Sequence, residues 1–210
     1  MRLFVAIDIA EEIRARLERF LEGVRPLAPD ANWVRPESFH LTLKFLGETP
    51  PEKADALRQS LTTVEGEAAE VCFCGLGFFP NPNRARVFWV GVEADARLTQ
   101  LAQAVDEATA RLGFERDRQP YHPHLTLARA GERTSGNPRA RGSALGGRFR
   151  RLQEKLAAQG YGAACAGEAG ARPDFGTMTA REFHLYESRL SAVGARYSKV
   201  ASFPLKIELP

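Results

Sequence analysis

The sequence predicts an α+β fold of two pseudo-symmetric lobes, each an antiparallel-rich sheet with helices on its outer face, with an active-site cleft between the lobes. The first observation is a repeated tetrapeptide, His-Leu-Thr-Leu, at residues 40–43 and 124–127. The second is that each copy follows an apolar strand and an amphipathic helix, so the two halves of the chain run in the same order. The third is a β-hairpin pattern between the two copies, which favours antiparallel pairing.

In the first half of the chain, strand and helix patterns alternate. Runs of β-branched and apolar residues predict buried strands, and apolar residues three or four apart predict amphipathic helices. Thr49 as N-cap, Pro50 at the first helical position and Glu52 three residues after the cap predict the start of the second helix. The expected elements are a strand at 2–9, a helix at 11–24, a strand at 38–47 and a helix at 49–64.

The second half is predicted by the same signals. An Asn-Pro-Asn-Arg turn joins two apolar runs into the hairpin. Asp95 is the expected N-cap of a helix that ends near Gly113, where glycine typically follows a helix. The expected elements are strands at 70–80 and 85–93, a helix from 96 to about 113, a strand at 121–129, and closing strands at 181–190 and 197–209.

Residues 131–176 depart from this pattern. The segment is rich in glycine, alanine and arginine, with six arginines from Arg133 to Arg151 and a helical pattern near 148–159. A connection of this length is typical of a functional loop, and a solvated loop is the alternative. We therefore expect one domain over residues 1–210, formed by two interleaved lobes and carrying this additional loop and helix.

Composition limits the possible partners and compartments. The chain has 24 arginines and 5 lysines at a net charge of +3, a bias that suits phosphate binding but also follows from a GC-rich genome. No apolar run reaches the roughly 20 residues that cross a bilayer, and no signal peptide is evident, so we expect a cytoplasmic monomer without a membrane partner. Three cysteines without metal-ligand spacing predict buried thiols and no cofactor.

The repeated tetrapeptide predicts a pair of polar faces. Alternate side chains of a strand share a face, so Leu41 and Leu43 are expected in the core and His40 with Thr42 on the opposite side. By the same argument, His124 and Thr126 are expected together on the face of their strand that is opposite the core. If a pseudo-twofold axis relates the halves, the two polar pairs face each other.

Two histidines at one site suit concerted acid–base catalysis. The ordinary pKa of histidine, about 6.5, allows one imidazole to be neutral and accept a proton while the other is charged and donates one. The hydroxyls of Thr42 and Thr126 are suited to bind the non-bridging oxygens of a phosphate as its charge develops. The pattern therefore predicts phosphodiester chemistry that needs no metal.

Three charged or titratable neighbours of the motifs remain open. Arg129 is five residues after His124, which puts it on the other face of a regular strand. It either reaches the phosphate through a bend at the strand end or forms a surface ion pair. Lys44 shares the face of His40 by its even offset, and either approaches the anion or forms a solvated strand end. His122 shares the face of His124, and either supports the cleft or forms half of a metal site.

Other rings near the motifs have less specific predictions. Trp33, Phe45 and Tyr121 flank the motifs and are suited either to stack on a base or ribose or to pack in the core. His184 lacks the accompanying threonine and is expected to be structural.

The motif pair resembles a known superfamily. Phe-His-Leu-Thr-Leu-Lys-Phe-Leu-Gly-Glu and Tyr-His-Pro-His-Leu-Thr-Leu-Ala-Arg are similar to the two His-x-Thr motifs of the 2H phosphoesterases, and most closely to the RNA 2′,3′-cyclic phosphodiesterases, also called 2′-5′ RNA ligases. The first nine residues and the stretch 183–205 are also similar, so the resemblance covers nearly the whole chain. Residues 131–176 are longer than the corresponding connection in that family.

The resemblance implies a function and roles for individual residues. His40 and His124 match the catalytic histidines, Thr42 and Thr126 match the phosphate-binding threonines, and Arg129 is an additional candidate substrate ligand. The implied reaction is metal-independent hydrolysis of RNA 2′,3′-cyclic phosphate ends, or of small cyclic nucleotides, to 2′-phosphomonoesters, with reversible 2′-5′ ligation.

Two alternatives come from other classes. The first is a non-catalytic RNA- or nucleotide-binding module on the same scaffold. The second is a metal-dependent hydrolase that uses His122 and His124.

Overall fold

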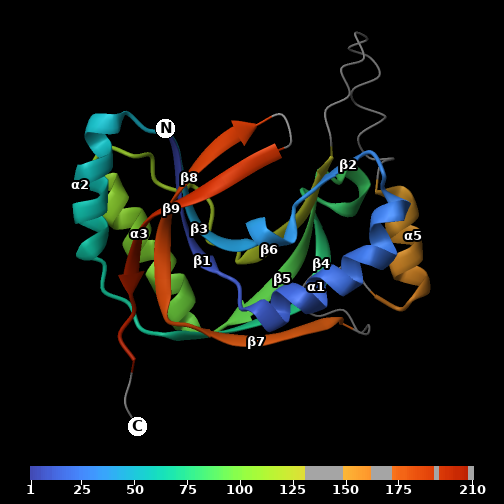
Figure 1. Ribbon diagram of the computed structural model, residues 1–210. Coiled ribbons are helices and arrows are strands. Elements are labelled where there is room, and N and C mark those ends of the chain that lie inside the picture. The colour runs from blue at the N-terminus through green and yellow to red at the C-terminus, as the bar shows by residue number, and fades with distance from the viewer. Residues whose placement is uncertain (131–148, 162–171, 192–193, 208–210) are drawn as a thin grey trace.

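Two antiparallel sheets form the framework of the protein (Figure 1). The computed structural model describes residues 1–130, 149–161, 172–191 and 194–207. One sheet has the strand order β3-β1-β8-β9 and the other has the order β2-β6-β5-β4-β7. The strands are β1 (Arg2–Asp8), β2 (Ala31–Trp33), β3 (His40–Glu48), β4 (Ala69–Phe79), β5 (Val87–Ala94), β6 (His124–Ala130), β7 (Asp174–Ala180), β8 (Glu182–Ser191) and β9 (Gly194–Pro204).

Helices cover these sheets in a crossed arrangement. The α-helices are α1 (Glu11–Val24), α2 (Pro51–Thr62), α3 (Ala96–Ala110) and α5 (Arg150–Ala158), and the short 3-10 helices are η1 (Arg25–Leu27), η2 (Pro36–Ser38) and η3 (Pro82–Arg84). Helix α1 follows β1 of the first sheet but contacts β7 of the second. Helix α3 follows β5 of the second sheet and contacts β3 of the first sheet as well as β4 of the second. The two halves are therefore interleaved.

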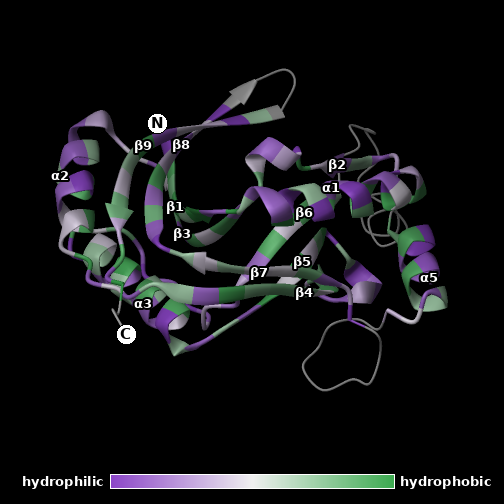
Figure 2. Cartoon of the chain, turned by 60° about the horizontal axis from the view of Figure 1, so that its bottom comes forward, coloured by the Kyte–Doolittle hydropathy of each residue, from purple (hydrophilic) through white to green (hydrophobic). Residues whose placement is uncertain are grey.

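One apolar core joins the two halves. The helices alternate hydrophilic and hydrophobic residues along their length, as Figure 2 shows for α2 and α5. Their apolar sides meet the sheets in a single cluster of buried residues drawn from both sheets. The rings of Phe20 on α1 and Phe175 on β7 illustrate the crossing, with centroids 5.2 Å apart.

Most predicted elements are confirmed. The side chain of Asp95 accepts a hydrogen bond from the backbone N–H of Arg97, as expected for an N-cap. The prediction for Thr49 is wrong, because Pro50 occupies the N-cap position of α2 and the Thr49 hydroxyl donates to the carbonyl of Gly47. Strands β2 and β7 were not predicted, since β2 is only three residues long and β7 begins within the glycine-rich segment 131–176.

The long segment is described only in part. Its predicted helix is present as α5, but residues 131–148 and 162–171 lie outside the described residues, together with four of the six arginines. No helix among the described residues has the length and apolar character needed to cross a membrane.

A β-bulge interrupts each strand that carries the repeated motif. In the pairing of β1 with β3, Val5 is opposite Lys44 and Ala6 is opposite Thr42, so Leu43 is the extra residue. The pairing of β5 with β6 skips Leu127 in the same way. An extra residue reverses the in–out alternation of the strand beyond it.

The bulge overturns the prediction for Lys44. Because Leu43 is the extra residue, Lys44 follows it into the interior and is only 2% exposed. Its ammonium donates to a carboxylate oxygen of Asp106 on α3 and to the carbonyl of Glu115 at 2.7 Å, and lies 3.3 Å from Asp117. Lys44 therefore does not approach the site and instead ties β3 to α3 and to the loop that leads to β6.

Replacing Lys44 by alanine should reduce the free energy of unfolding by about 3 kcal/mol, because it leaves the mostly buried carboxylate of Asp106 with only the exposed Arg116, 3.6 Å away, as its counter-ion. The matched control is Lys206→Ala, since Lys206 forms an exposed ion pair with Glu65 and should contribute less than about 1 kcal/mol. Urea unfolding measures both variants. Equal decreases in the free energy of unfolding would show that the buried ion pair stabilises the fold no more than the exposed one does.

Candidate active site

The structure brings the two motifs together, although they lie on different sheets. Strands β3 and β6 contact each other, and the hydroxyl of Tyr121 donates to the carbonyl of Thr42 at 3.0 Å, which ties the loop before β6 to the first motif. The charge of His124 acts on His40. The fold therefore brings the two imidazoles into one site, as the repeated motif predicts.

Both imidazoles are held in the same way. The ring Nδ1 of His40 donates to the carbonyl of Ser38, and that of His124 donates to the carbonyl of His122, each at 2.8 Å. A carbonyl oxygen only accepts, so each neutral ring carries its proton on Nδ1 and leaves Nε2 as the acceptor. Neither Nε2 has a hydrogen-bond partner within the part of the chain that the structure describes.

Burial and nearby charges adjust the proton affinity of both rings. Burial lowers the pKa of His40 below its usual value, with further lowering by Arg129 and His124, while the Ser38 carbonyl and Asp8 act in the opposite direction. Burial likewise lowers the pKa of His124; the His122 carbonyl acts in the opposite direction, and the charges of the His122 ring and Arg129 lower the pKa further. Both rings are therefore more readily neutral than a free histidine.

The threonines stand beside their histidines with free hydroxyls. Thr42 and Thr126 are half-buried, and among the described residues neither hydroxyl has a hydrogen-bond partner. Each threonine shares the strand face of its histidine, because both precede the bulge. Two hydroxyls and two imidazoles thus offer four hydrogen-bonding groups to a tetrahedral anion.

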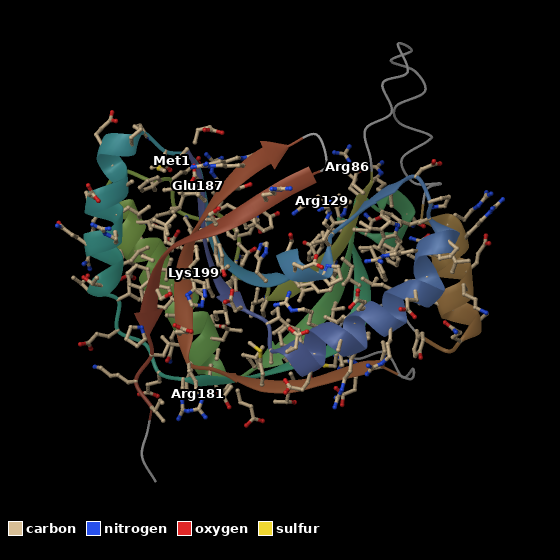
Figure 3. All side chains as sticks on the ribbon, in the orientation of Figure 1. Met1, Arg86, Arg129, Arg181, Glu187 and Lys199 are labelled. Atoms are coloured by element: carbon tan, nitrogen blue, oxygen red, sulfur yellow. The ribbon has the colours of Figure 1, made fainter. Side chains whose placement is uncertain are left out.

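Arg129 faces the site because of the bulge in β6. Its offset of five from His124 predicts the opposite face of a regular strand, but the extra residue Leu127 restores it to the histidine face. Its positive charge lowers the pKa of His40, His124 and the hydroxyl of Tyr197, so the guanidinium is near enough to act on all three. Figure 3 shows Arg129 with Arg86 at the end of β6, and no carboxylate among the described residues pairs with Arg129.

Aromatic rings form the walls around each imidazole. His40 contacts the rings of Phe4 and Tyr197, with centroids 4.7 and 5.1 Å away. His124 contacts Phe79 at 4.9 Å and Trp89 at 6.2 Å. These rings restrict the rotation of the imidazoles and keep water from one side of each.

A polar network adjoins the first histidine. Asp8 is directly opposite His40 in the strand pairing and accepts hydrogen bonds from the hydroxyl of Tyr186 and from Lys199, the latter at 2.8 Å. His184, as expected, is structural in its contacts: its Nδ1 bonds with the hydroxyl of Ser202 at 2.9 Å, and its Nε2 lies 3.4 Å from Asp8. The network holds the Asp8 carboxylate in place beside His40.

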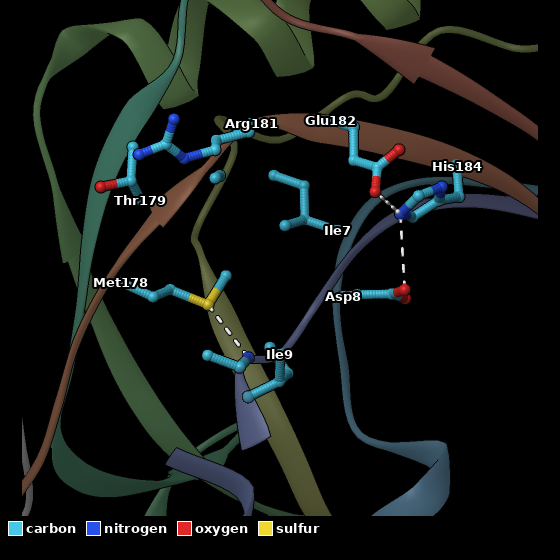
Figure 4. A pocket seen from close by; sticks show the side chains of 10 residues that line it. Ile7, Asp8, Ile9, Met178, Thr179, Arg181, Glu182 and His184 are labelled. Atoms are coloured by element: carbon cyan, nitrogen blue, oxygen red, sulfur yellow. Dashed lines mark hydrogen bonds and ion pairs between the residues drawn. The ribbon is translucent and has the colours of Figure 1, made fainter. Parts of the chain in front are cut away.

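A small pocket opens on the other side of this network (Figure 4). It has a volume of about 220 Å³ and lies between the end of β1 and the strands β7 and β8, with Asp8, Met178 and Glu182 among its lining residues. The sulfur of Met178 accepts a hydrogen bond from the backbone N–H of Ala10. Neither motif lines the pocket, but the pocket shares Asp8 with the surroundings of His40.

The metal alternative gains no support from the geometry. The rings of His122 and His124 have centroids 6.3 Å apart, and no group of three or more His, Cys, Asp or Glu side chains suited to hold a metal occurs among the described residues. The expectation of metal independence remains a prediction, which activity in a chelator tests.

Three residues of the site were missed by the sequence analysis. Asp8, Phe4 and Tyr197 lie on strands that were predicted, but their position beside His40 depends on which strands pair with β3. Phe4 and Asp8 alternate with the core residues Leu3, Val5 and Ile7, which was a usable signal because it assigns Phe4 and Asp8 to one face of β1. Only the pairing shows that this face is the histidine face.

Titration of the imidazoles by NMR should give a pKa below about 6.5 for both His40 and His124. Asp8→Asn removes a negative charge that favours the imidazolium and should lower the pKa of His40 further. Arg129→Met removes a positive charge and should raise the pKa of both rings. His184 is the internal reference, because Asp8 but not Arg129 acts on it. If neither variant changed the pKa of His40, the charges of Asp8 and Arg129 would not act on His40, and both residues would be excluded from the site.

Comparisons with known proteins agree with this geometry. A family model described as LigT like phosphoesterase matches the chain twice, at residues 7–89 and 90–197. An RNA 2′,3′-cyclic phosphodiesterase from Archaeoglobus fulgidus is 32% identical over 203 residues, which are 97% of this chain and 99% of that protein. The two successive matches coincide with the two motif-bearing halves, so the pseudo-symmetric lobes are confirmed.

Solved structures show the same fold over the whole chain. LigT from Escherichia coli, complexed with 3′-AMP, has a TM-score of 0.70 and 25% identity, with 97% of each chain covered. A protein from Thermus thermophilus has a TM-score of 0.69 and 27% identity, with both chains fully covered. The chain therefore belongs to the LigT-like phosphoesterase family, in agreement with the resemblance of its motifs to the 2H phosphoesterases.

Proposed function

We propose that the protein hydrolyses the 2′,3′-cyclic phosphate at an RNA end, or in a small cyclic nucleotide, and leaves a 2′-phosphomonoester. The observation that carries the proposal is the pair of imidazoles from different sheets, each presenting an Nε2 without a partner among the described residues beside a free threonine hydroxyl. The name of the Archaeoglobus relative and the nucleotide bound to the Escherichia coli protein support the substrate class.

The reaction needs one acid and one base. The oxygen of water attacks phosphorus while the base takes its proton, and the bond from phosphorus to O3′ breaks while the acid protonates O3′. The products are a 2′-phosphomonoester and a 3′-hydroxyl. Thr42, Thr126 and Arg129 stabilise the additional negative charge on the non-bridging oxygens as the new bond forms.

We assign His40 as the acid and His124 as the base. Asp8 stabilises a proton on His40, whereas no carboxylate among the described residues contributes to the pKa of His124. A ring that keeps its proton more readily is the better donor to O3′, and a neutral ring is the better acceptor from water. The reverse reaction of the same groups joins a cyclic phosphate to a 5′-hydroxyl, but the concentration of water favours hydrolysis.

A binding module without catalysis explains less of the site. Such a module has no need for two imidazoles with the same fixed tautomer, or for surroundings that lower the pKa of both rings. Threonines and Arg129 alone would hold a phosphate.

The test is incubation with an RNA that ends in a 2′,3′-cyclic phosphate, in excess chelator, with the product end identified. Wild-type protein should form the 2′-phosphomonoester, and His40→Ala and His124→Ala should each reduce kcat/KM by about 10²- to 10⁴-fold, because each removes one proton transfer. His122→Ala is the matched control: it keeps the carbonyl that orients His124 and should stay within about threefold.

The outcomes separate the three candidate functions. Tight binding of the RNA end without turnover would favour the binding module. Activity that chelator abolishes, and that His122→Ala also abolishes, would favour the metal-dependent hydrolase. Full activity of either catalytic variant would contradict the proposed mechanism.

The dependence of kcat/KM on pH should be bell-shaped with its maximum below about pH 6.5. Catalysis requires protonated His40 and neutral His124, and this form is most populated near the two pKa values, both of which are lowered from about 6.5. A bound anionic phosphate raises the pKa of both rings, so the kcat profile should lie at higher pH. A flat profile between about pH 5 and 9 would rule out catalysis by this pair.

A further inference from the structure

We propose that the hydroxyl of Tyr197 is a further catalytic group of the site, which donates a hydrogen bond to one non-bridging oxygen of the substrate phosphate. This inference rests on the proposed function and adds a residue to the same site. It gives the phosphate a ligand from β9, a strand that carries neither motif and belongs to the other sheet from Arg129.

The ring of Tyr197 is packed against the proposed acid. It meets the ring of His40 nearly at a right angle, 88°, with centroids 5.1 Å apart. Phe4 supports it from β1, again with centroids 5.1 Å apart. Since Phe4 is 3% exposed and also contacts His40, the three rings form one packed cluster. The hydroxyl is therefore held near His40 before substrate binds, so less conformational entropy is lost on binding.

The hydroxyl of Tyr197 lacks the hydrogen bond that two neighbouring tyrosines make. The hydroxyl of Tyr121 donates to the carbonyl of Thr42. The hydroxyl of Tyr186 donates to Asp8. Tyr197 is half-buried, yet within the part of the chain that the structure describes its hydroxyl has no partner. A phenol in such surroundings usually bonds to a protein group, a water or a ligand, so this donor is available to a substrate.

Two arginines make the surroundings of this hydroxyl positive. Arg129 on β6 and Arg2 on β1 are near enough for their charges to lower the pKa of Tyr197, and no carboxylate among the described residues contributes to that pKa. Neither guanidinium pairs with a carboxylate of the described residues. Two free cations and a free hydroxyl, which come from three strands and both sheets, suit an anion such as a phosphate.

The hydroxyl stays protonated where the two histidines titrate. Burial raises the pKa of Tyr197 above its usual value, and this effect exceeds the lowering by the two arginines. The hydroxyl is therefore a neutral donor and does not repel the phosphate. Its hydrogen bond strengthens in the transition state, because negative charge on the non-bridging oxygens increases as water bonds to phosphorus.

The position of Tyr197 connects the two sides of the site. His40 and Tyr197 come from the first sheet, whereas His124 and Arg129 come from the second. Since the ring of Tyr197 contacts His40 and its hydroxyl is near Arg129, a phosphate between the two imidazoles lies next to the hydroxyl. The bond is therefore expected at only one of the two non-bridging oxygens, the one nearer to β9.

The experiment uses Tyr197→Phe, which removes the hydroxyl but keeps the ring against Phe4 and His40. The substrates are uridine 2′,3′-cyclic phosphate and the two diastereomers of its phosphorothioate, each with sulfur in place of one non-bridging oxygen. For the phosphate, kcat/KM should fall by about 10- to 100-fold, mainly through kcat, as expected for a hydrogen bond to a charged group. Sulfur is a weak acceptor, so one diastereomer should show a similar loss and the other almost none.

The matched control is Tyr161→Phe, because Tyr161 lies just after α5, outside both motif strands, and should leave all three values unchanged. An equal loss by Tyr197→Phe on all three substrates would assign the hydroxyl to structure and overturn the inference, as would unchanged values on all three. If the wild-type protein hydrolyses none of them, the proposed function fails together with this inference, a result distinct from an active enzyme that does not need the hydroxyl.

Discussion

The extra residue in each motif strand is the constraint on which the site depends. A regular strand would expose every second residue after the histidine, which would turn Lys44 towards the substrate and Arg129 away from it. With Leu43 and Leu127 bulged, histidine and threonine keep one face, two consecutive residues enter the core, and the face then continues with Phe45 or Arg129. One irregularity, used twice, decides which side chains a substrate meets.

The bulge in β3 turns Lys44 into the interior, where its contacts help to connect the two halves of the chain. The ammonium of Lys44 donates to Asp106 and to a carbonyl in the loop before β6. In the same loop, the hydroxyl of Tyr121 donates to the carbonyl of Thr42 in the first motif. That loop also supplies the His122 carbonyl that orients His124. The loop is thus fixed to one histidine strand and positions the other histidine. The crossed packing of α1 and α3 adds a second connection between the sheets.

Sequence patterns predicted the helices, the strands and the type of chemistry well, but they predicted poorly which residues are neighbours in three dimensions. Periodicity located the motif strands and the long helices because these segments bury one continuous face. The repeated motif indicated His40, Thr42, His124 and Thr126 as candidate site residues, because imidazole and hydroxyl groups have characteristic chemistry that the residue type alone reveals. The prediction for Lys44 failed, since no local signal distinguishes a bulge from a regular strand. Asp8 was missed because its place beside His40 follows from strand pairing, which local patterns do not specify.

The proposed mechanism requires a single phosphorus atom to lie between the two imidazoles. A crystal structure of the protein with a uridine–vanadate complex, a mimic of the five-coordinate phosphorus, would locate that atom. We expect Nε2 of His40 and Nε2 of His124 each within about 3 Å of oxygens on opposite sides of the vanadium, with both threonine hydroxyls on the remaining oxygens. Vanadate bound by only one histidine, or bound in the pocket beside Asp8, would contradict the mechanism.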